Sequence, residues 1–272
     1  MTKLPDLFNL NQRVAVVTGG AGLLGAEFCR TLAQAGASVV IADLDNQCAG
    51  DLARDLVQGG YQAVSAPTDV AELASVQRMV SAALESFGRL DILVNSAVLD
   101  PKFDPQHGGH TNSFEEYPLE AWNQALSVNL TGMFLCCQAA TQPMLAQGGG
   151  VIINLSSIYG LAAPDQRLYQ RPGQPPQYKP VYYSVTKAGV IGLTQYLAAY
   201  YAGKNIRVNA LTPGGVYNDH DEEFVRAYSA RAILGRMAYK DDMNGALLFL
   251  ASDASKYMTG ANLVVDGGWT TW

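Results

Sequence analysis

Short apolar, β-branched runs alternate with segments of helical spacing in the first third of the chain, and this alternation constrains the fold more than any other feature. The apolar runs cover residues 13–18, 38–43, 62–67 and 91–95, and the helical segments cover 26–33, 47–58 and 73–87. Such apolar runs are typical of parallel strands buried on both faces. Strands that alternate with helices form right-handed crossovers and a doubly wound parallel sheet. With no internal repeat or low-complexity linker, we expect one α/β domain over residues 1–272.

A glycine-rich turn joins the first strand to the first helix. It reads Thr-Gly-Gly-Ala-Gly-Leu-Leu-Gly over residues 18–25. Glycines let backbone N–H groups approach a pyrophosphate, and a helix N-terminus favours the negative charge of that group. Glycines alone would be unspecific, but a strand before them and a helix after them predict a dinucleotide site.

An aspartate, Asp43, ends the second strand. A carboxylate at this position accepts hydrogen bonds from the ribose hydroxyls of the adenosine and repels a 2′-phosphate, which predicts NAD rather than NADP as the cofactor. The alternative is an aspartate that caps a helix or lies in a loop. Asp45 is a second, less favoured candidate for binding the adenosine ribose.

Tyr183 and Lys187 are four residues apart at the start of a long apolar segment that reads as a helix. Residues with this spacing project from one face of a helix. A free phenol has a pKa of about 10, and a neighbouring ammonium favours the phenolate. The pair would then exchange a proton with an alcohol or a carbonyl near neutral pH. Tyr and Lys also occur at this spacing by chance on amphipathic helices.

The composition excludes several partner classes. The net charge is −6, only 15% of residues are charged, and no run is rich in Lys or Arg. Nucleic acid and anionic membrane surfaces are therefore not expected as partners. No apolar run reaches the length of a membrane span, and the N-terminal residues lack the basic-then-apolar form of a signal peptide. We expect a cytoplasmic protein that acts on a small molecule.

No metal site is expected. The four cysteines form no C-x-x-C pair, and adjacent Cys136 and Cys137 on an apolar stretch read as small core residues. His107 and His110 lie in a glycine-rich loop without a third ligand at useful spacing.

An ordered set of short motifs runs along the chain. The set comprises Thr18-Gly19 with Gly25, Asp69-Val70, Asn95-x-Ala97, Asn129, Ser156-Ser157, Tyr183-x-x-x-Lys187, Pro213-Gly214 and Asp266-Gly267-Gly268. In this order the motifs resemble the short-chain dehydrogenase/reductase family over about residues 8–269. The resemblance implies a Rossmann-type fold with seven parallel strands, hydride transfer to or from a nicotinamide, and a homotetramer or homodimer.

The same resemblance implies roles for particular residues. The catalytic residues would be Asn129, Ser157, Tyr183 and Lys187. Ser157 would bind the substrate oxygen and Tyr183 would be the acid/base, while Asn129 would hold helix backbone and a water near Lys187. Lys187 would bind the nicotinamide ribose and lower the pKa of Tyr183. The cofactor-binding residues would be Gly19, Gly22, Leu23, Leu24, Gly25, Asp43, Asp69, Val70, Asn95, Ala97, Tyr183, Lys187, Pro213, Gly214 and Val216.

Three departures from the family pattern stand out. Leu23 occupies the place of the usual middle glycine, Val98 that of the glycine in Asn-Asn-Ala-Gly, and no threonine follows Pro213-Gly214. The first two departures affect how the cofactor fits its site. The third affects the contact to the carboxamide group of the nicotinamide. None of them removes a catalytic group.

Three loops, at about residues 98–118, 158–180 and 215–236, follow strands and are expected to surround the substrate. The second carries Arg167, Arg171 and Lys179 against only Asp165. Arginine suits planar anionic groups, so we expect Arg167, with Ser157 and Tyr183, to bind a polar, phosphorylated or carboxylated sugar-like substrate. The alternative is a solvated loop or a subunit contact.

The second loop and residues 255–260 also resemble a gluconate 5-dehydrogenase-like subgroup, whose members include bacterial dehydrogenases of surface-sugar and flagellin-glycan biosynthesis. This implies hydroxyl/keto interconversion on a sugar or aminosugar. Trp269 and Trp272 end the chain. Because exposed tryptophans are unusual on a monomer, we expect them at a subunit interface or near a neighbouring active site.

The chain is therefore expected to be an NAD(P)-dependent dehydrogenase/reductase of CH–OH groups that uses NAD. Two alternatives stay open. One is an NAD-dependent epimerase or dehydratase, although little chain remains after Asp266 for a substrate domain. The other is a nucleotide-sensing regulator without turnover, which the intact catalytic set disfavours.

Overall fold

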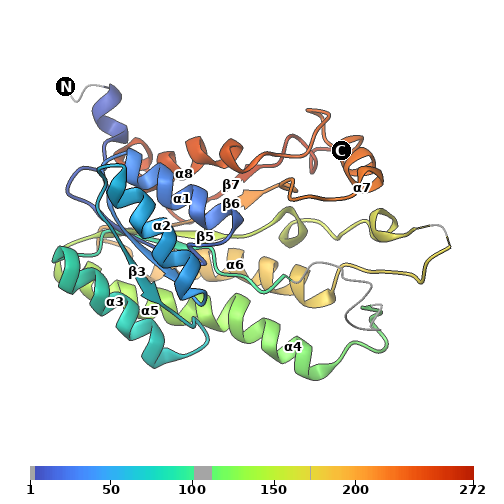
Figure 1. Ribbon diagram of the computed structural model, residues 1–272, viewed down its shortest axis with the longest axis horizontal. Coiled ribbons are helices and arrows are strands. Elements are labelled where there is room, and N and C mark those ends of the chain that lie inside the picture. Colours follow the sequence, from blue (N-terminus) through green and yellow to red (C-terminus); the bar gives the residue numbers. More distant parts are fainter. Residues whose placement is uncertain (1–3, 101–111, 172) are drawn as a thin grey trace.

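One parallel sheet of seven strands forms the centre of the protein (Figure 1). The structure is a computed structural model that describes residues 4–100, 112–171 and 173–272. The strand order is β3-β2-β1-β4-β5-β6-β7, and every neighbouring pair is parallel. The strands are β1 (Val14–Thr18), β2 (Ser38–Asp43), β3 (Ala63–Pro67), β4 (Ile92–Asn95), β5 (Gly150–Leu155), β6 (Ile206–Pro213) and β7 (Asn262–Val265). The predicted doubly wound α/β fold is confirmed.

Helices cover both faces of this sheet, as the alternation of strands and helices requires. The helices are α1 (Leu23–Gln34), α2 (Asn46–Gln58), α3 (Leu73–Phe87), α4 (Leu119–Leu126), α5 (Met133–Ala146), α6 (Val181–Tyr200), α7 (Glu222–Ser229) and α8 (Asn244–Ala251). Short helical turns are η1 (Leu4–Phe8), η2 (Ser127–Gly132), η3 (Ile158–Gly160), η4 (Gln166–Tyr169), η5 (Lys240–Met243) and η6 (Asp253–Ser255).

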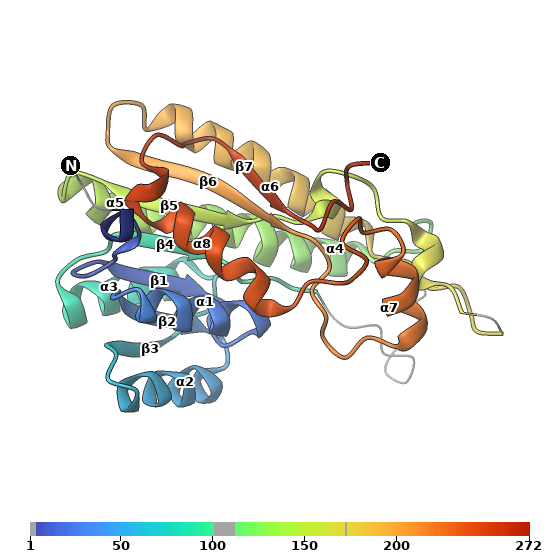
Figure 2. The same ribbon diagram turned by 90° about the horizontal axis from the view of Figure 1, so that it is seen from above.

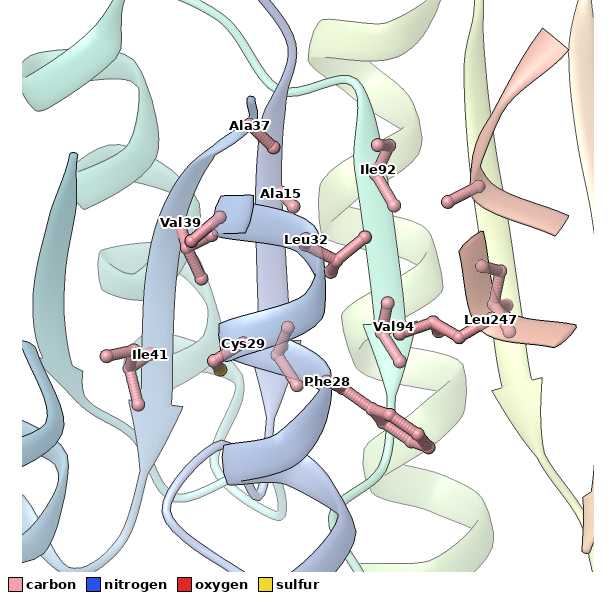
Figure 3. Packing of buried hydrophobic residues seen from close by; sticks show 14 of the residues in the cluster. Ala15, Phe28, Cys29, Leu32, Ala37, Val39, Ile41, Ile92, Val94 and Leu247 are labelled. Carbon is pink, nitrogen blue, oxygen red and sulfur yellow. The ribbon is translucent and has the colours of Figure 1, made fainter. Parts of the chain in front are cut away.

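Two separate apolar layers hold these helices against the sheet. Successive strand residues point to opposite faces, so Ala15 and Val17 join the layer under α1, α2 and α8, whereas Val14 and Val16 join the layer over α3, α5 and α6. Figure 3 shows Phe28, Cys29 and Leu32 of α1 packed over the strands in the first layer. All three side chains are fully buried, and burying each large one contributes roughly 1.5–3 kcal/mol.

The order of the strands reverses between β1 and β4. From β1 the chain proceeds outward through β2 and β3, then crosses back to β4 and continues through β5, β6 and β7. The crossovers on the two sides of this point diverge, which leaves a crevice at the carboxyl ends of the strands. Strands β1, β4 and β5 end at this crevice, with Thr18, Asn95 and Leu155 as their last residues.

Segments from distant parts of the sequence gather beyond these carboxyl ends. Figure 2 shows α7 and the loop that contains η3 and η4 at the same end of the molecule. The predicted long helix after residue 182 is α6, and the second loop is irregular apart from two short 3₁₀ turns. Among the described residues, no helix combines the length and apolar character that a bilayer span demands.

Candidate active site

A cavity of about 1500 Å³ lies along the carboxyl ends of the strands. Of the residues expected to bind the cofactor, all except Asn95 line it. Of the expected catalytic residues, Ser157, Tyr183 and Lys187 line it and Asn129 does not. The sheet therefore brings together groups from all parts of the sequence.

The glycine turn forms the wall of the cavity beside β1. Gly19 has a φ of 61°, and a Cβ there would lie 2.8 Å from the Cα of Ala97. A Cβ on Gly25 would overlap the carbonyl oxygen of Gly19. Leu23 begins α1 with its side chain 41% exposed, so the turn closes without a glycine at that position. The N-terminus of α1 thus faces the cavity as an anion-binding end.

Asp43 and Asp45 have separate tasks at the end of β2. Asp43 accepts hydrogen bonds from the N–H groups of Ala21, at 2.9 Å, and of Asp45, at 3.0 Å, which fixes its carboxylate beside the glycine turn. Asp45 caps α2 by accepting from the N–H of Cys48 at 3.0 Å. The capping alternative considered for Asp43 therefore belongs to Asp45, although both residues line the cavity.

The segment after β3 supplies the next part of the wall. Asp69 accepts a hydrogen bond from the Ala71 N–H at 2.9 Å, and Val70 is buried. Val70 packs directly on Gly132, where a Cβ would lie 2.8 Å from the valine Cγ2. This contact fixes the position of η2 relative to the cofactor wall.

Asn95 lies under the cavity rather than in its wall. Its Nδ2 donates to Oδ1 of Asn154 at 2.8 Å, and Nδ2 of Asn154 donates to Thr194 on α6 at 3.0 Å. The Thr18 hydroxyl accepts from the N–H groups of Ser96, at 3.1 Å, and of Ala97, at 3.2 Å. These buried polar bridges connect β1, β4, β5 and α6 below the site.

Tyr183 and Lys187 lie one helical turn apart at the start of α6, as their spacing predicts. The Nζ of Lys187 is 5.8 Å from the centroid of the Tyr183 ring and donates to the Leu155 carbonyl at 2.8 Å. The Ser157 side chain is hydrogen-bonded to Tyr183, and its Oγ also accepts from the Tyr159 N–H at 3.2 Å. Ser157 and Tyr183 can therefore share one substrate oxygen, and the Lys187 ammonium lies behind them.

Burial dominates the acidities of both groups on α6. It lowers the pKa of the Lys187 ammonium to about 8, against the opposing charge of Asp100. It raises the pKa of the Tyr183 phenol, and Asp100 adds to this increase. The pKa of Tyr183 is therefore raised on balance, because desolvation of the phenolate is the largest effect.

Asn129 lies in the π-helical turn η2, between α4 and α5. Its side chain is buried, accepts from the N–H of Leu99 at 2.6 Å and donates to the carbonyl of the same residue at 3.1 Å. Asn129 thus holds the chain after β4, whereas the resemblance implied that it holds helix backbone.

The end of β6 closes the far wall. Pro213, Gly214 and Val216 line the cavity. A Cβ on Gly214 would lie 2.9 Å from the Asp266 Cα, so glycine permits this close approach. The N–H of Gly215 donates to the hydroxyl of Tyr228, which ties the strand end to α7.

The basic residues of the second loop are already paired. Arg167 lies outside the cavity with its side chain 85% exposed, and forms an ion pair with Asp165. Arg171 pairs with Asp221 of the α7 segment at 2.7 Å, and both line the cavity. The structure therefore does not bring Arg167 to the substrate side, because its short tether to Asp165 turns it toward solvent.

An aromatic cluster stands behind the substrate end of the cavity. Trp269 is 5% exposed and packs against Tyr159 and Tyr228, each with ring centroids 5.9 Å apart. The expectation that Trp269 lies at a subunit interface is wrong, since it is buried within its own chain. Trp272 is exposed, and its indole N–H donates to the Arg231 carbonyl at 2.9 Å.

Metal ligands do not cluster in the described part of the chain. No group of three or more His, Cys, Asp or Glu side chains there is arranged to hold an ion. His107 and His110 lie outside the described residues. Cys136 and Cys137 are buried in the core as predicted.

Comparison with known proteins assigns this arrangement to a family. The family model described as enoyl-(acyl carrier protein) reductase matches residues 20–270. The chain belongs to the short-chain dehydrogenase/reductase family. It is an oxidoreductase that acts on CH–OH groups with a nicotinamide dinucleotide, NAD or NADP.

Similar proteins include two named dehydrogenases and one solved structure. Cis-4-hydroxycyclohexanecarboxylate dehydrogenase of Sinomonas cyclohexanicum is 40% identical over 95% of this chain and 97% of its own. D-threitol dehydrogenase of Mycolicibacterium smegmatis is 37% identical over 97% of this chain and 95% of its own. A gluconate 5-dehydrogenase from Burkholderia cenocepacia J2315, in complex with NADP and tartrate, superimposes with a TM-score of 0.87 at 32% identity, covering 99% of this chain and all of the other.

Sequence reasoning missed several residues that shape the site. Thr18 and Asn154 carry buried hydrogen bonds beneath the cavity, and Tyr228 anchors α7. Asp100 meets Lys179, one of the basic residues noted in the second loop, at the cavity wall. Thr18 stands in the glycine motif and Asn154 in a buried strand, where a polar residue is itself a signal, but no local pattern identifies Tyr228 or the pairing of Asp100 with Lys179.

Replacing Gly25 with alanine tests the glycine turn. The added Cβ would overlap backbone that cannot move aside, so we expect the free energy of unfolding to fall by roughly 1–3 kcal/mol and NADH affinity to drop at least about tenfold. Urea unfolding and NADH fluorescence titration measure the two effects.

Gly245→Ala is the matched control, because the space around the exposed Gly245 on α8 is open and the variant should be at least as stable as wild type. A Gly25→Ala protein with unchanged stability and NADH affinity would contradict this account of the turn.

Proposed function

We propose that this protein is an NAD-dependent dehydrogenase that interconverts a hydroxyl and a keto group on a small, neutral polyhydroxy compound such as a sugar or sugar alcohol. The observation that carries the proposal is the convergence of Ser157, Tyr183 and Lys187 at the wall of a cavity that also contains a glycine turn and Asp43. A dinucleotide bound along this cavity would supply the hydride acceptor or donor.

The residues of the turn fit such a dinucleotide. The glycines remove side chains where a pyrophosphate would approach, and α1 begins directly beyond them. Asp43 would accept hydrogen bonds from ribose hydroxyls, and Lys187 would hold the second ribose.

Three side chains of the chain perform the acid/base work in this proposal. During oxidation the phenolate form of Tyr183 takes the hydroxyl proton of the substrate, and the Ser157 hydroxyl donates a hydrogen bond to the same oxygen as it becomes a carbonyl. When protonated, the Lys187 ammonium places a positive charge beside the phenol of Tyr183. In the reverse direction Tyr183 returns the proton.

The charges of the cavity support a neutral substrate over a phosphorylated one. Besides Lys187, its described walls carry two basic side chains, Arg171 and Lys179, and carboxylates neutralise both. Binding an anion would require one of these pairs to open, which costs desolvation and a lost hydrogen bond. Tyr159 and Phe224 add aromatic faces suited to a carbon ring or chain.

Turnover should require Tyr183. In Tyr183→Phe we expect kcat to fall by at least about a hundredfold, because the proton acceptor is lost, while NADH affinity stays within about threefold. The measurement is the rate of NAD reduction with a panel of candidate substrates. The panel contains D-threitol, cis-4-hydroxycyclohexanecarboxylate, aldoses, aminosugars and the phosphate esters of the same sugars.

On this panel, kcat/KM for each neutral compound should exceed that for its phosphate ester by at least about tenfold, since the described cations of the cavity other than Lys187 are each paired with a carboxylate. A phosphate ester that outperforms its parent alcohol would contradict the neutral substrate. Equal turnover by Tyr183→Phe and wild type would contradict the assignment of the acid/base.

Asp43 should set the preference for NAD over NADP. In Asp43→Asn we expect the ratio of kcat/KM with NAD to that with NADP to fall at least about tenfold, because the repulsion of a 2′-phosphate is removed. Initial rates with both cofactors measure the ratio.

Asp45→Asn is the control, because asparagine caps a helix as well as aspartate does. An equal fall in both variants, or none in Asp43→Asn, would count against Asp43 as the discriminating group.

We also propose that the protein is a homodimer or homotetramer. Helices α5 and α6 on one side of the sheet expose large apolar side chains, including Phe134, Val185, Tyr196 and Tyr200, and the last two stack on each other. Light scattering should give a mass above that of one chain, and Tyr196→Glu combined with Tyr200→Glu should lower it. A wild-type mass equal to one chain would contradict the proposal.

A further inference from the structure

An ion pair between two loops lies directly on the ring of Tyr183. The Nζ of Lys179, in the loop before α6, is 2.6 Å and 2.8 Å from the two carboxylate oxygens of Asp100, in the segment after β4. The same Nζ lies 4.0 Å from the centroid of the Tyr183 ring, closer than the Nζ of Lys187 at 5.8 Å. Two ammonium groups therefore neighbour one phenol.

Hydrogen bonds to neighbouring segments fix the backbone of both members of this pair. The N–H of Lys179 donates to Gln166 at 2.9 Å, and the amide of Gln166 donates back to the Lys179 carbonyl at 3.3 Å. Asp100 follows Leu99, whose N–H and carbonyl are both bound by the buried side chain of Asn129. The pair is thus anchored through η4 on one side and η2 on the other.

Burial separates this pair from an ordinary surface ion pair. The Lys179 side chain is 12% exposed and that of Asp100 is 29% exposed, whereas Arg167 in the same loop is 85% exposed. A solvated ion pair contributes little and is screened by salt. Charges enclosed in a cavity wall act strongly on a neighbouring acid/base group.

The charged and titratable groups that face Tyr183 come from three segments. They are Asp100 after β4, Ser157, Tyr159, Tyr169 and Lys179 between the end of β5 and α6, and Tyr182 and Lys187 on α6. From the α7 side the packed cluster contributes Phe224 and Tyr228. Asp100 is the carboxylate of this set, and Lys179 is the group that neutralises it.

We propose that Lys179 and Asp100 are a positioning pair for the acid/base tyrosine: Asp100 holds the Lys179 ammonium on the Tyr183 ring, and together they set the pH range over which Tyr183 accepts the substrate proton. The pair deepens the proposed dehydrogenase function and rests on it, because it presupposes the acid/base role of Tyr183. An ammonium on the ring favours the phenolate, and a nearby carboxylate disfavours it.

The two partners have opposite effects on the groups beside them. Asp100 raises the pKa of both Tyr183 and Lys187, and Lys179 lowers that of Lys187. Removing the carboxylate should therefore move both titrations to lower pH. Removing the Lys179 ammonium should move both to higher pH, because Asp100 is then left uncompensated.

The first test measures this coupling without turnover. Lysine labelled with ¹³C at Cε reports the titration of Lys187, and its signal is assigned by its loss in Lys187→Met. Relative to wild type, we expect the midpoint to rise by about one pH unit in Lys179→Met and to fall by about one pH unit in Asp100→Asn. Lys204→Met, which removes an exposed ammonium in the turn after α6, is the matched control and should leave it unchanged.

The second test measures the reaction. With D-threitol and NAD, the alkaline rise of kcat/KM for oxidation should shift by about one pH unit, upward in Lys179→Met and downward in Asp100→Asn. KM at the pH optimum should change less than about threefold, because the pair acts through Tyr183 rather than on the substrate. Lys179→Arg, which keeps the charge, should restore most of the wild-type profile.

The outcomes separate the two proposals. Midpoints of Lys187 that match wild type in both Lys179→Met and Asp100→Asn overturn the positioning pair, whatever the turnover. Shifted midpoints with NADH binding but no oxidation of any compound on the panel support the pair and count against the proposed polyhydroxy substrate. A changed KM with an unchanged pH profile would assign Lys179 to substrate binding and overturn the inference.

Discussion

The reversal of strand order between β1 and β4 is the constraint on which the rest of the structure depends. It opens a crevice at the carboxyl ends of the strands. The glycine turn and Ser157 follow strands that end there, and Asp43 is the last residue of the neighbouring strand β2. The turn can face the crevice because Gly19 and Gly25 let the backbone of α1 approach that of β1. A side chain at either position would push the helix away and widen the site. Cofactor binding and the packing of α1 against the sheet therefore depend on the same glycines.

A second constraint is the burial of the polar groups beneath the cavity. Asn95, Asn154 and Thr194 satisfy one another across β4, β5 and α6, and Lys187 donates to the end of β5. Buried polar groups cost free energy unless they are paired, so these bonds specify how α6 lies against the sheet. That placement determines the distance between Tyr183 and Ser157. The same burial makes the ionisation of both α6 groups sensitive to any further charge nearby.

The fold was predictable from sequence because its signals are local. Apolar strands, helical spacing and the glycine turn each depend on a few neighbouring residues, and the family motifs added the strand number. The positions of Tyr183 and Lys187 followed from helical geometry. Trp269 shows the limit, since a tryptophan at the end of a chain gives no sign that Tyr159 and Tyr228 will cover it.

The loops were the least predictable part for the same reason. Arg167, Arg171 and Lys179 looked alike as basic residues in one segment, but each found a different carboxylate, and two of those lie far away in sequence. Only tertiary contacts decide which cation faces solvent, which tethers α7 and which reaches the catalytic ring. A composition that suggested an anion-binding loop is therefore compatible with a neutral cavity, because charge counted along a sequence does not say how much of it is already compensated. Long substrate loops of this kind can alter both the compounds that enter and the acidity of the catalytic tyrosine without any change in the catalytic residues themselves.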